Sequence, residues 1–238
     1  MPKNQTELDR ECVARHEAGH AVASYWCQIP GSFICLGGDN DNAGEWHADD
    51  DALWVAFNYL IFNKKSWRQL LRNLFVASYA GEIVDLRMNN MSTELAAARA
   101  DGDKQVLEAL IAHLADVDLT NEGAEAMDKG FQSLFAELKR IGREINEELI
   151  RLTSFRDAVD VVAAELLRTG AVTESKWSAL IDQCAKPNVR KSLPTLDHRE
   201  TQLHAHYIWR RRESREGNDW NDWFTAERGL QVAKLSGG

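Results

Sequence analysis

Apolar residues recur at helical spacing along most of the chain. The clearest stretch is residues 120–153, where one stripe of apolar side chains comprises Phe131, Leu134, Leu138, Ile141, Ile145 and Leu149. Such a stripe indicates an amphipathic helix that buries one face. The same periodicity, together with residues that end helices, predicts further helices at residues 6–28, 51–62 and 66–88 and another after Asp103. Two shorter helices follow near the end of this region, with Gly170 between them as a C-cap.

Two short runs interrupt the helical pattern. Residues 32–36 and 45–48 are strand-like, and between them lies a stretch rich in glycine, aspartate and asparagine that begins at Gly37. These residue types favour tight turns, so the two runs are predicted to form a hairpin. Residues 89–102 are loop-prone with some helical character. The predicted fold class is mainly α with a small β hairpin or sheet.

A change of composition near residue 186 predicts a domain boundary. Residues 186–196 contain two prolines and few apolar side chains, which is typical of a linker. We therefore predict a first domain at residues 1–185, a linker at 186–198 and a helical hairpin at 199–238. Within the hairpin, Gly217-Asn218-Asp219 is expected to end one helix and start the next.

Composition and charge narrow the class of protein. The chain has 238 residues, of which 44% are hydrophobic and 27% charged, as is typical of a globular protein. Its net charge of −9 argues against nucleic acid as a partner, because that binding neutralises phosphates. The apolar run at residues 53–62 is interrupted by Asn58 and is shorter than the roughly 20 residues that span a bilayer. With the polar start Met-Pro-Lys, this predicts a cytoplasmic protein with no signal peptide and no membrane span.

The cysteines and the missing nucleotide motif exclude two further classes. Cys12, Cys27, Cys35 and Cys184 form no CxxC pair, so free thiols are expected rather than a cysteine zinc site. No GxxxxGK[ST] stretch occurs in the sequence, so no P-loop ATPase is expected in the chain.

The strongest chemical signal is the motif His16-Glu17-Ala18-Gly19-His20 in the first predicted helix. Histidines four residues apart project from one face of a helix, so both imidazoles can reach one ion. Imidazole ligands suit zinc, and the intervening Glu17 can accept a proton from a water that the metal activates. The alternative is a chance HExxH sequence on a helix surface.

The context of this motif resembles the zinc helix of the FtsH-type peptidases, the proteolytic part of membrane-anchored AAA proteases. The segment is Val13-Ala14-Arg15-His16-Glu17-Ala18-Gly19-His20-Ala21-Val22. Looser matches keep the order of that family over residues 6–185, at 33–36, 44–46, 78–85, 102–103 and 170–173. The chain departs from the family pattern at Ala80, Glu82 and Asp85, and it has no ATPase module or membrane anchor.

The resemblance implies roles for particular residues. His16 and His20 would bind zinc, Glu17 would be the general base, and an aspartate would be the third ligand, for which Asp103 is the best match. Residues Val106, Leu107, Leu110 and Ile111 place Asp103 at the start of an amphipathic helix, as the family's ligand is placed. Asp85 is expected to accept a hydrogen bond from a ligand histidine.

Three alternatives stay open around this assignment. Asp85 and Asp101 are rival third ligands, and Asp101 with Asp103 would in the simplest case only cap a helix.

The strand around residues 44–48 is a candidate for pairing with an extended substrate. His47 in that strand is interpreted as an ordinary strand histidine rather than a catalytic residue.

The C-terminal segment resembles a short bacterial domain of unknown function with a Trp-x-x-Ala-Glu motif. Here the motif is Trp223-Phe224-Thr225-Ala226-Glu227. Trp209, Trp220 and Trp223 are expected to form the core of the helical hairpin, because aromatic side chains build a small core efficiently. A role in binding a partner protein is the alternative.

Together these features predict a zinc-dependent endopeptidase that acts on unfolded or flexible polypeptides without an ATPase of its own. In this mechanism Glu17 deprotonates the water and returns the proton to the leaving amine. Two alternatives remain: a non-catalytic interaction module that contains a metal, and a peptidase subunit that depends on a separate ATPase partner.

Overall fold

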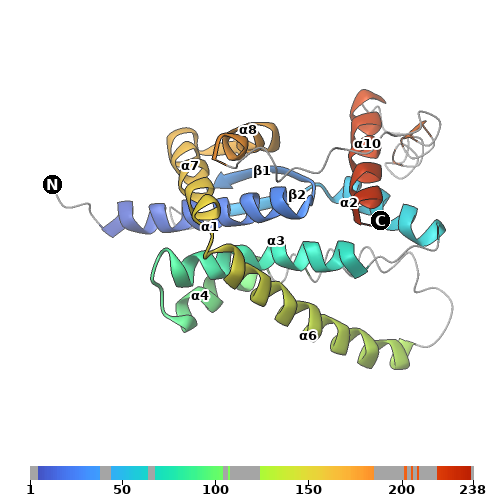
Figure 1. The fold of residues 1–238 in the computed structure, drawn as a ribbon, viewed down its shortest axis with the longest axis horizontal. Helices are drawn as coiled ribbons and strands as arrows, with labels where there is room; N and C mark the ends of the chain where they lie inside the picture. The colour runs from blue at the N-terminus through green and yellow to red at the C-terminus, as the bar shows by residue number, and fades with distance from the viewer. Residues whose placement is uncertain are drawn as a thin grey trace.

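The computed structural model describes residues 5–37, 44–63, 68–103, 107, 124–184, 201, 202, 205, 208 and 219–236. Over these residues the protein is mainly helical with a small antiparallel sheet, which confirms the predicted class (Figure 1). The elements are α1 (Gln5–Cys27), β1 (Gly31–Leu36), β2 (Gly44–Ala48), α2 (Asp50–Phe62), α3 (Arg68–Arg87), α4 (Thr93–Arg99), α6 (Ala124–Leu149), α7 (Thr153–Thr169), β3 (Ala171–Thr173), α8 (Glu174–Cys184) and α10 (Asp219–Ser236).

Helices α1 and α3 form the centre of the molecule and run side by side (Figure 1). Every residue of α3 from Leu74 to Asp85 is buried, so this stretch is covered on all sides. The two helices approach closely at Gly19, where a Cβ atom would lie 2.8 Å from Cγ2 of Val84. Helix α6 packs on the other side of α3, and α7 packs on α1. This arrangement turns one face of α1 toward the buried stretch of α3.

The sheet has the strand order β2-β1-β3 and lies against α1. The predicted hairpin is confirmed: β1 and β2 are antiparallel, with Cys35 opposite Glu45 and Ile34 opposite Trp46. The third strand was not predicted. It has three residues, of which only Val172 is buried, so it carries too little alternation to be recognised in the sequence. It joins β1 because Gly170, the predicted helix end at φ +77°, turns the chain back toward that strand.

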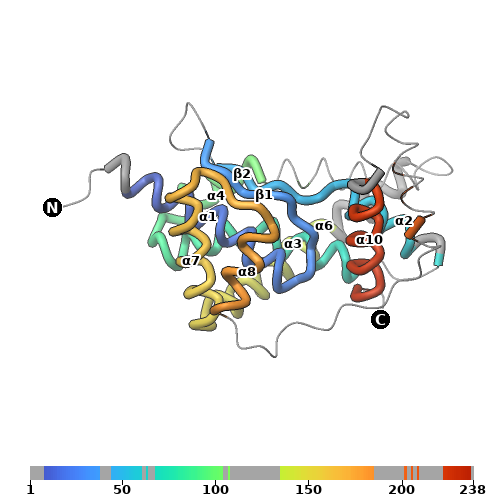
Figure 2. The backbone as a smooth tube through the Cα atoms, turned by 90° about the horizontal axis from the view of Figure 1, so that it is seen from above, coloured from blue at the N-terminus to red at the C-terminus, as the bar shows by residue number. Residues whose placement is uncertain are grey.

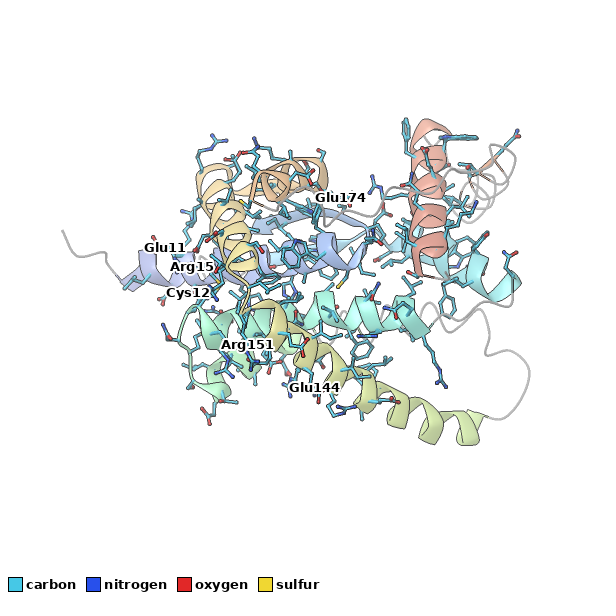
Figure 3. All side chains as sticks on the ribbon, in the orientation of Figure 1. Glu11, Cys12, Arg15, Glu144, Arg151 and Glu174 are labelled. Atoms are coloured by element: carbon cyan, nitrogen blue, oxygen red, sulfur yellow. The ribbon has the colours of Figure 1, made fainter. Side chains whose placement is uncertain are left out.

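The boundaries of two predicted segments differ from the structure. The helix expected at 120–153 ends at Leu149, and α7 begins at Thr153. Arg156 donates to the carbonyl of Ile150, which caps the end of α6 beside Arg151 at this junction (Figure 3). Asp103 does not start its helix, because Asp101 is already helical.

Helix α10 packs on α2 at one end of the molecule (Figure 2). At Gly229 a Cβ atom would lie 2.4 Å from the carbonyl oxygen of Ala52, so only glycine allows the two backbones to approach this closely. Leu230 and Ala233 of α10 share one apolar core with Leu53 of α2. Of the three tryptophans predicted for a hairpin core, Trp223 is partly buried, while Trp209 and Trp220 lie outside the residues whose side chains are described, as does the predicted linker. No helix within the described residues is long and apolar enough to cross a membrane.

Candidate metal centre

Helix α1 places His16 and His20 one turn apart on its face toward α3, and both side chains are buried. Asp103 lies beside them, so three side chains predicted as zinc ligands converge. Nε2 of His16 lies 3.1 Å from Nε2 of His20 and 3.0 Å from Oδ2 of Asp103. Nε2 of His20 lies 3.3 Å from the same oxygen. Asp85 and Asp101 do not belong to this group of three.

The protons on the two imidazoles point away from this convergence. Nδ1 of His20 lies 2.8 Å from the backbone carbonyl of Ala77, which can only accept, so this nitrogen carries the proton. Nδ1 of His16 donates to Oδ2 of Asp85 at 2.8 Å. In neutral histidines both Nε2 atoms therefore present lone pairs toward each other and toward a carboxylate. Three acceptors facing one point are stabilised by a proton or a metal ion between them.

The spacing of these atoms fits zinc. With bonds of about 2.0–2.1 Å at tetrahedral angles, nitrogen and oxygen ligands lie about 3.3 Å apart, close to the 3.0–3.3 Å observed. The space for the ion is left by Gly81 of α3, where a Cβ atom would lie 2.5 Å from Nε2 of both histidines. Two imidazoles and one carboxylate form the donor set of a catalytic zinc site that keeps one position open.

Burial and the neighbouring charged groups shift the pKa values of His16 and Asp103 in opposite directions. Burial lowers the pKa of His16, but hydrogen bonds to the carboxylates of Asp103 and Asp85 outweigh it and raise this pKa to about 10. Burial raises the pKa of Asp103, but the neighbouring His20 and His16 hold it well below its usual range. Without a metal the centre thus attracts protons, which a metal must displace.

Glu17 has the environment of a general base. Its side chain is buried, and Oε2 has no hydrogen-bond partner among the described residues. Burial raises the pKa of Glu17 to about 7. Strand β2 covers it, since a Cβ atom at Gly44 would lie 2.6 Å from Oε1 of Glu17. The carboxyl group therefore lies between the ligand helix and the edge of the sheet.

Side chains around His16 and His20 hold the two imidazoles in place, and most of these contacts were not predicted from the sequence. Oδ1 of Asp85 accepts from Nη1 of Arg99 at 3.1 Å and from Nδ2 of Asn89 at 2.8 Å, so α4 and the end of α3 hold the carboxylate that orients His16. The ring of Trp46 on β2 stacks on His20, with 5.6 Å between centroids. Only the role of Asp85 was predicted. The roles of Arg99 and Trp46 were not predicted, because they arise from packing between distant segments.

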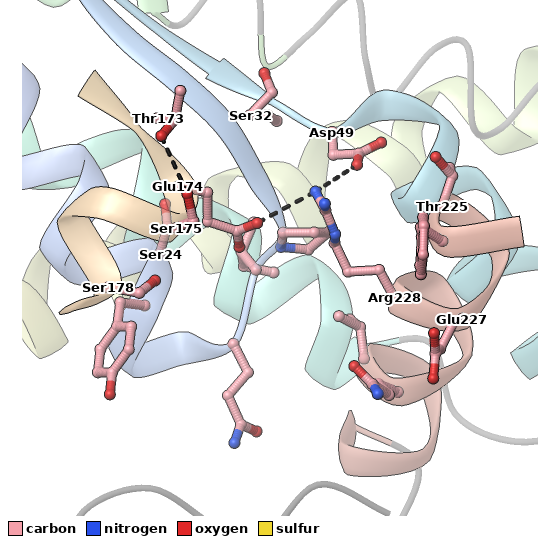
Figure 4. Close-up of a pocket in the computed structure, with 18 of the residues that line it drawn as sticks. Ser24, Ser32, Asp49, Thr173, Glu174, Ser175, Ser178, Thr225, Glu227 and Arg228 are labelled. Carbon is pink, nitrogen blue, oxygen red and sulfur yellow. Dashed lines mark hydrogen bonds and ion pairs between the residues drawn. The ribbon is translucent and has the colours of Figure 1, made fainter. Parts of the chain in front are cut away.

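A large cleft lies elsewhere, between α10 and the segments around α8 (Figure 4). It has a volume of about 1350 Å³, and none of the residues of the metal centre lines it. Arg228 reaches across it from α10 to Asp49 at 2.8 Å and to Glu174 at 3.2 Å, and also donates to the carbonyl of Gly31. These contacts attach α10 to the rest of the protein, so the cleft lies along the interface between α10 and the segments that it contacts.

Comparison with known proteins concerns this C-terminal segment. Residues 197–231 match a family described as "Protein of unknown function (DUF2934)". The match includes the Trp-x-x-Ala-Glu motif of α10 and ends before the helix does. No curated protein matches the chain.

Proposed function

We propose that this protein is a zinc-dependent endopeptidase whose zinc ligands are His16, His20 and Asp103. The observation that carries the proposal is the convergence of Nε2 of His16, Nε2 of His20 and Oδ2 of Asp103 at 3.0–3.3 Å, beside the position of Gly81 where a side chain is absent. A structural zinc site would use four protein ligands, whereas three ligands leave one position for water or substrate. The FtsH-type resemblance of the helix favours the same chemistry.

Glu17 moves the proton in this proposal. A bound zinc would polarise the scissile carbonyl and lower the pKa of a water. Glu17 accepts the proton of that water and later donates it to the leaving amine. A carboxyl with a pKa of about 7, raised by burial, both accepts and releases a proton near neutral pH. The unpartnered Oε2 atom is available for this transfer.

The substrate class follows from the neighbouring strand. In the described sheet, β2 pairs only with β1, so its outer edge offers backbone groups to an extended chain. Gly44 of this strand touches Glu17, which brings a paired substrate next to the base. Edge pairing requires an extended backbone, so the substrates are unfolded or flexible polypeptides. Cleavage is independent of ATP in this chain, whose sequence has no P-loop motif.

The test combines metal content with a casein digest. The wild type should bind one zinc in this centre and cleave casein. Glu17→Gln should keep the metal and lose cleavage, because it removes the base and leaves the ligands. Glu11→Gln, on the same helix outside the centre, is the matched control and should cleave as the wild type does. Cleavage by Glu17→Gln at the wild-type rate would overturn the proposed role of this carboxylate.

One observation favours the non-catalytic alternative. Glu82 stands where the FtsH-type pattern has an arginine, and its buried carboxylate forms an ion pair with the partly exposed Arg143 of α6. This position therefore serves the packing of α3 on α6 rather than contact with a substrate. A chain that binds zinc fully but cleaves neither casein nor unstructured peptides, alone or with added ATPase partners, would establish a metal-containing interaction module.

A further inference from the structure

The outer face of the β1–β2 hairpin carries a second group of metal-binding side chains. Side chains alternate between the two faces of a strand, so Ile34 and Trp46 point to α1 while their neighbours point away. On this outer face Cys35 of β1 lies opposite Glu45 of β2, and His47 follows two residues later. None of these three residues belongs to the centre on α1.

The geometry of this group is close to that of a coordination site. One ligand atom from each of Cys35, Glu45 and His47 lies within 4.8 Å of the other two. Nε2 of His47 lies 2.8 Å from Oε2 of Glu45. The ring of His47 stacks on Phe33, with 4.1 Å between centroids, which restricts its orientation. The three side chains thus face one point from two hydrogen-bonded strands.

We propose that Cys35, Glu45 and His47 form a second zinc site. Thiolate, imidazole and carboxylate are all ligands of zinc, and sulfur with nitrogen favours it over magnesium or calcium. Ligand atoms around one zinc lie about 3.3–3.6 Å apart, given bonds of about 2.0–2.3 Å. The side chains of Glu45 and His47 are 64% and 40% exposed, so they are free to close the remaining distance. Water completes the coordination.

Binding exchanges one proton for the metal. The Cys35 thiol loses its proton to solvent as the sulfur–zinc bond forms, and the hydrogen bond between His47 and Glu45 is replaced by bonds to the ion. The ion then links β1 to β2 next to Gly44, the residue that touches Glu17. This site does not depend on the proposed peptidase function, because it shares no ligand with the centre on α1.

Cobalt spectroscopy tests the site, since a thiolate bound to Co²⁺ gives a charge-transfer band that histidine and carboxylate ligands do not. Metal-depleted full-length protein would be titrated with Co²⁺ under reducing conditions. The wild type and Asp103→Ala should both show the band. Cys35→Ser and His47→Ala should lose it. Cys184→Ser, which removes another partly buried thiol, is the matched control and should keep it.

A second measurement covers the case in which a variant fails to fold. In the wild-type protein, zinc should slow alkylation of Cys35, read by peptide mass spectrometry, and leave Cys184 unchanged. No charge-transfer band at excess Co²⁺, a band that survives Cys35→Ser, or equal alkylation of Cys35 with and without zinc would each overturn the proposal.

Discussion

At the residue scale, the metal centre depends on one position without a side chain. Gly81 faces His16 and His20 from α3, and its missing Cβ leaves the space in which the three acceptor atoms meet. The protons on Nδ1 of both histidines are directed outward by Asp85 and by the Ala77 carbonyl. Each of the two histidines is therefore oriented by a partner on α3.

Gly81→Ala should abolish zinc binding at the His16–His20–Asp103 centre without unfolding the protein. The new methyl group would lie 2.5 Å from both Nε2 atoms, inside the volume of the ion. Zinc content after dialysis measures the effect in a Cys35→Ser background, which lacks the proposed second zinc site, and circular dichroism checks the fold. Ala80→Gly, at the adjacent buried position, is the control and should retain zinc. Stoichiometric zinc in Gly81→Ala would place the ion elsewhere.

Asp103 and Asp85 should differ in how strongly they affect zinc affinity. Asp103→Ala removes a proposed ligand, whereas Asp85→Ala removes the acceptor that orients His16, for which a loss of about 10–100-fold is typical. Asp103→Ala should cost more than that, and Asp101→Ala should change little. Competition with a chelator of known affinity measures all three variants. An empty site in Asp85→Ala beside a full one in Asp103→Ala would show that the roles are reversed.

At the element scale, α3 is held between α1 and α6 by contacts of different kinds. Toward α1 the contacts are close packing at Gly19 against Val84 and the hydrogen bonds of the two histidines to α3. Toward α6 a buried carboxylate, Glu82, pairs with Arg143, and the side-chain amide of Asn146 donates to the carbonyl of Val76 at 2.8 Å. The α6 contacts do not touch the ligands, so they are expected to stabilise the fold rather than set metal affinity.

Arg143→Ala should lower the free energy of unfolding by about 2 kcal/mol, because it leaves the buried carboxylate of Glu82 without its partly exposed partner. Arg140→Ala on the same helix breaks an exposed pair with Glu144 and should cost at most about 1 kcal/mol. Urea denaturation measures both. Adding Glu82→Gln to Arg143→Ala should recover part of the loss. Equal effects of Arg140→Ala and Arg143→Ala would show that burial of Glu82 has no energetic consequence.

At the scale of the whole molecule, the C-terminal helix is joined to the rest by a shared core and by one arginine. Leu230 and Ala233 pack with α2, and Arg228 bridges to Asp49 and Glu174 across the cleft of Figure 4. Part of the apolar face of the matched segment therefore packs against α2, outside the segment itself. We expect α2 and α10 to unfold together.

Gly229→Ala should destabilise the protein although alanine favours helices by about 1 kcal/mol over glycine. Its Cβ would lie 2.4 Å from the Ala52 carbonyl oxygen and 2.6 Å from Cβ of Val55, so α10 must move away from α2. Overpacking of this kind costs about 1–3 kcal/mol. The midpoint of thermal unfolding and hydrogen exchange in α2 are the measurements. Gln231→Ala on the same helix is the control, and an unchanged or higher midpoint in Gly229→Ala would contradict the close contact.

Local patterns in the sequence determined most of the secondary structure and the core of the candidate site. The helical period predicts α1, α2 and α3 closely, Gly170 marks the end of α7, and turn residues predict the β1–β2 hairpin. Residues four positions apart on a helix share a face, so the pairing of His16 with His20 follows from α1 alone. The selection of Asp103 came from the resemblance and the helix pattern, and the structure places it with the two histidines.

Only the tertiary structure decided which residues from distant parts of the chain join the two histidines and the hairpin in the proposed sites. The carboxylate of Asp103 lies 87 positions from His16, and Arg99 acts on His16 only through Asp85. Cys35 lies close to His47 because of the register of the two strands, although the sequence has no CxxC spacing that would indicate a metal site. The reason is physical: backbone hydrogen bonding repeats with a short period that the sequence displays, whereas contacts between elements depend on how their surfaces pack. The glycines at positions 19, 81 and 229 permit those contacts, and their role is visible only once the facing element is in place.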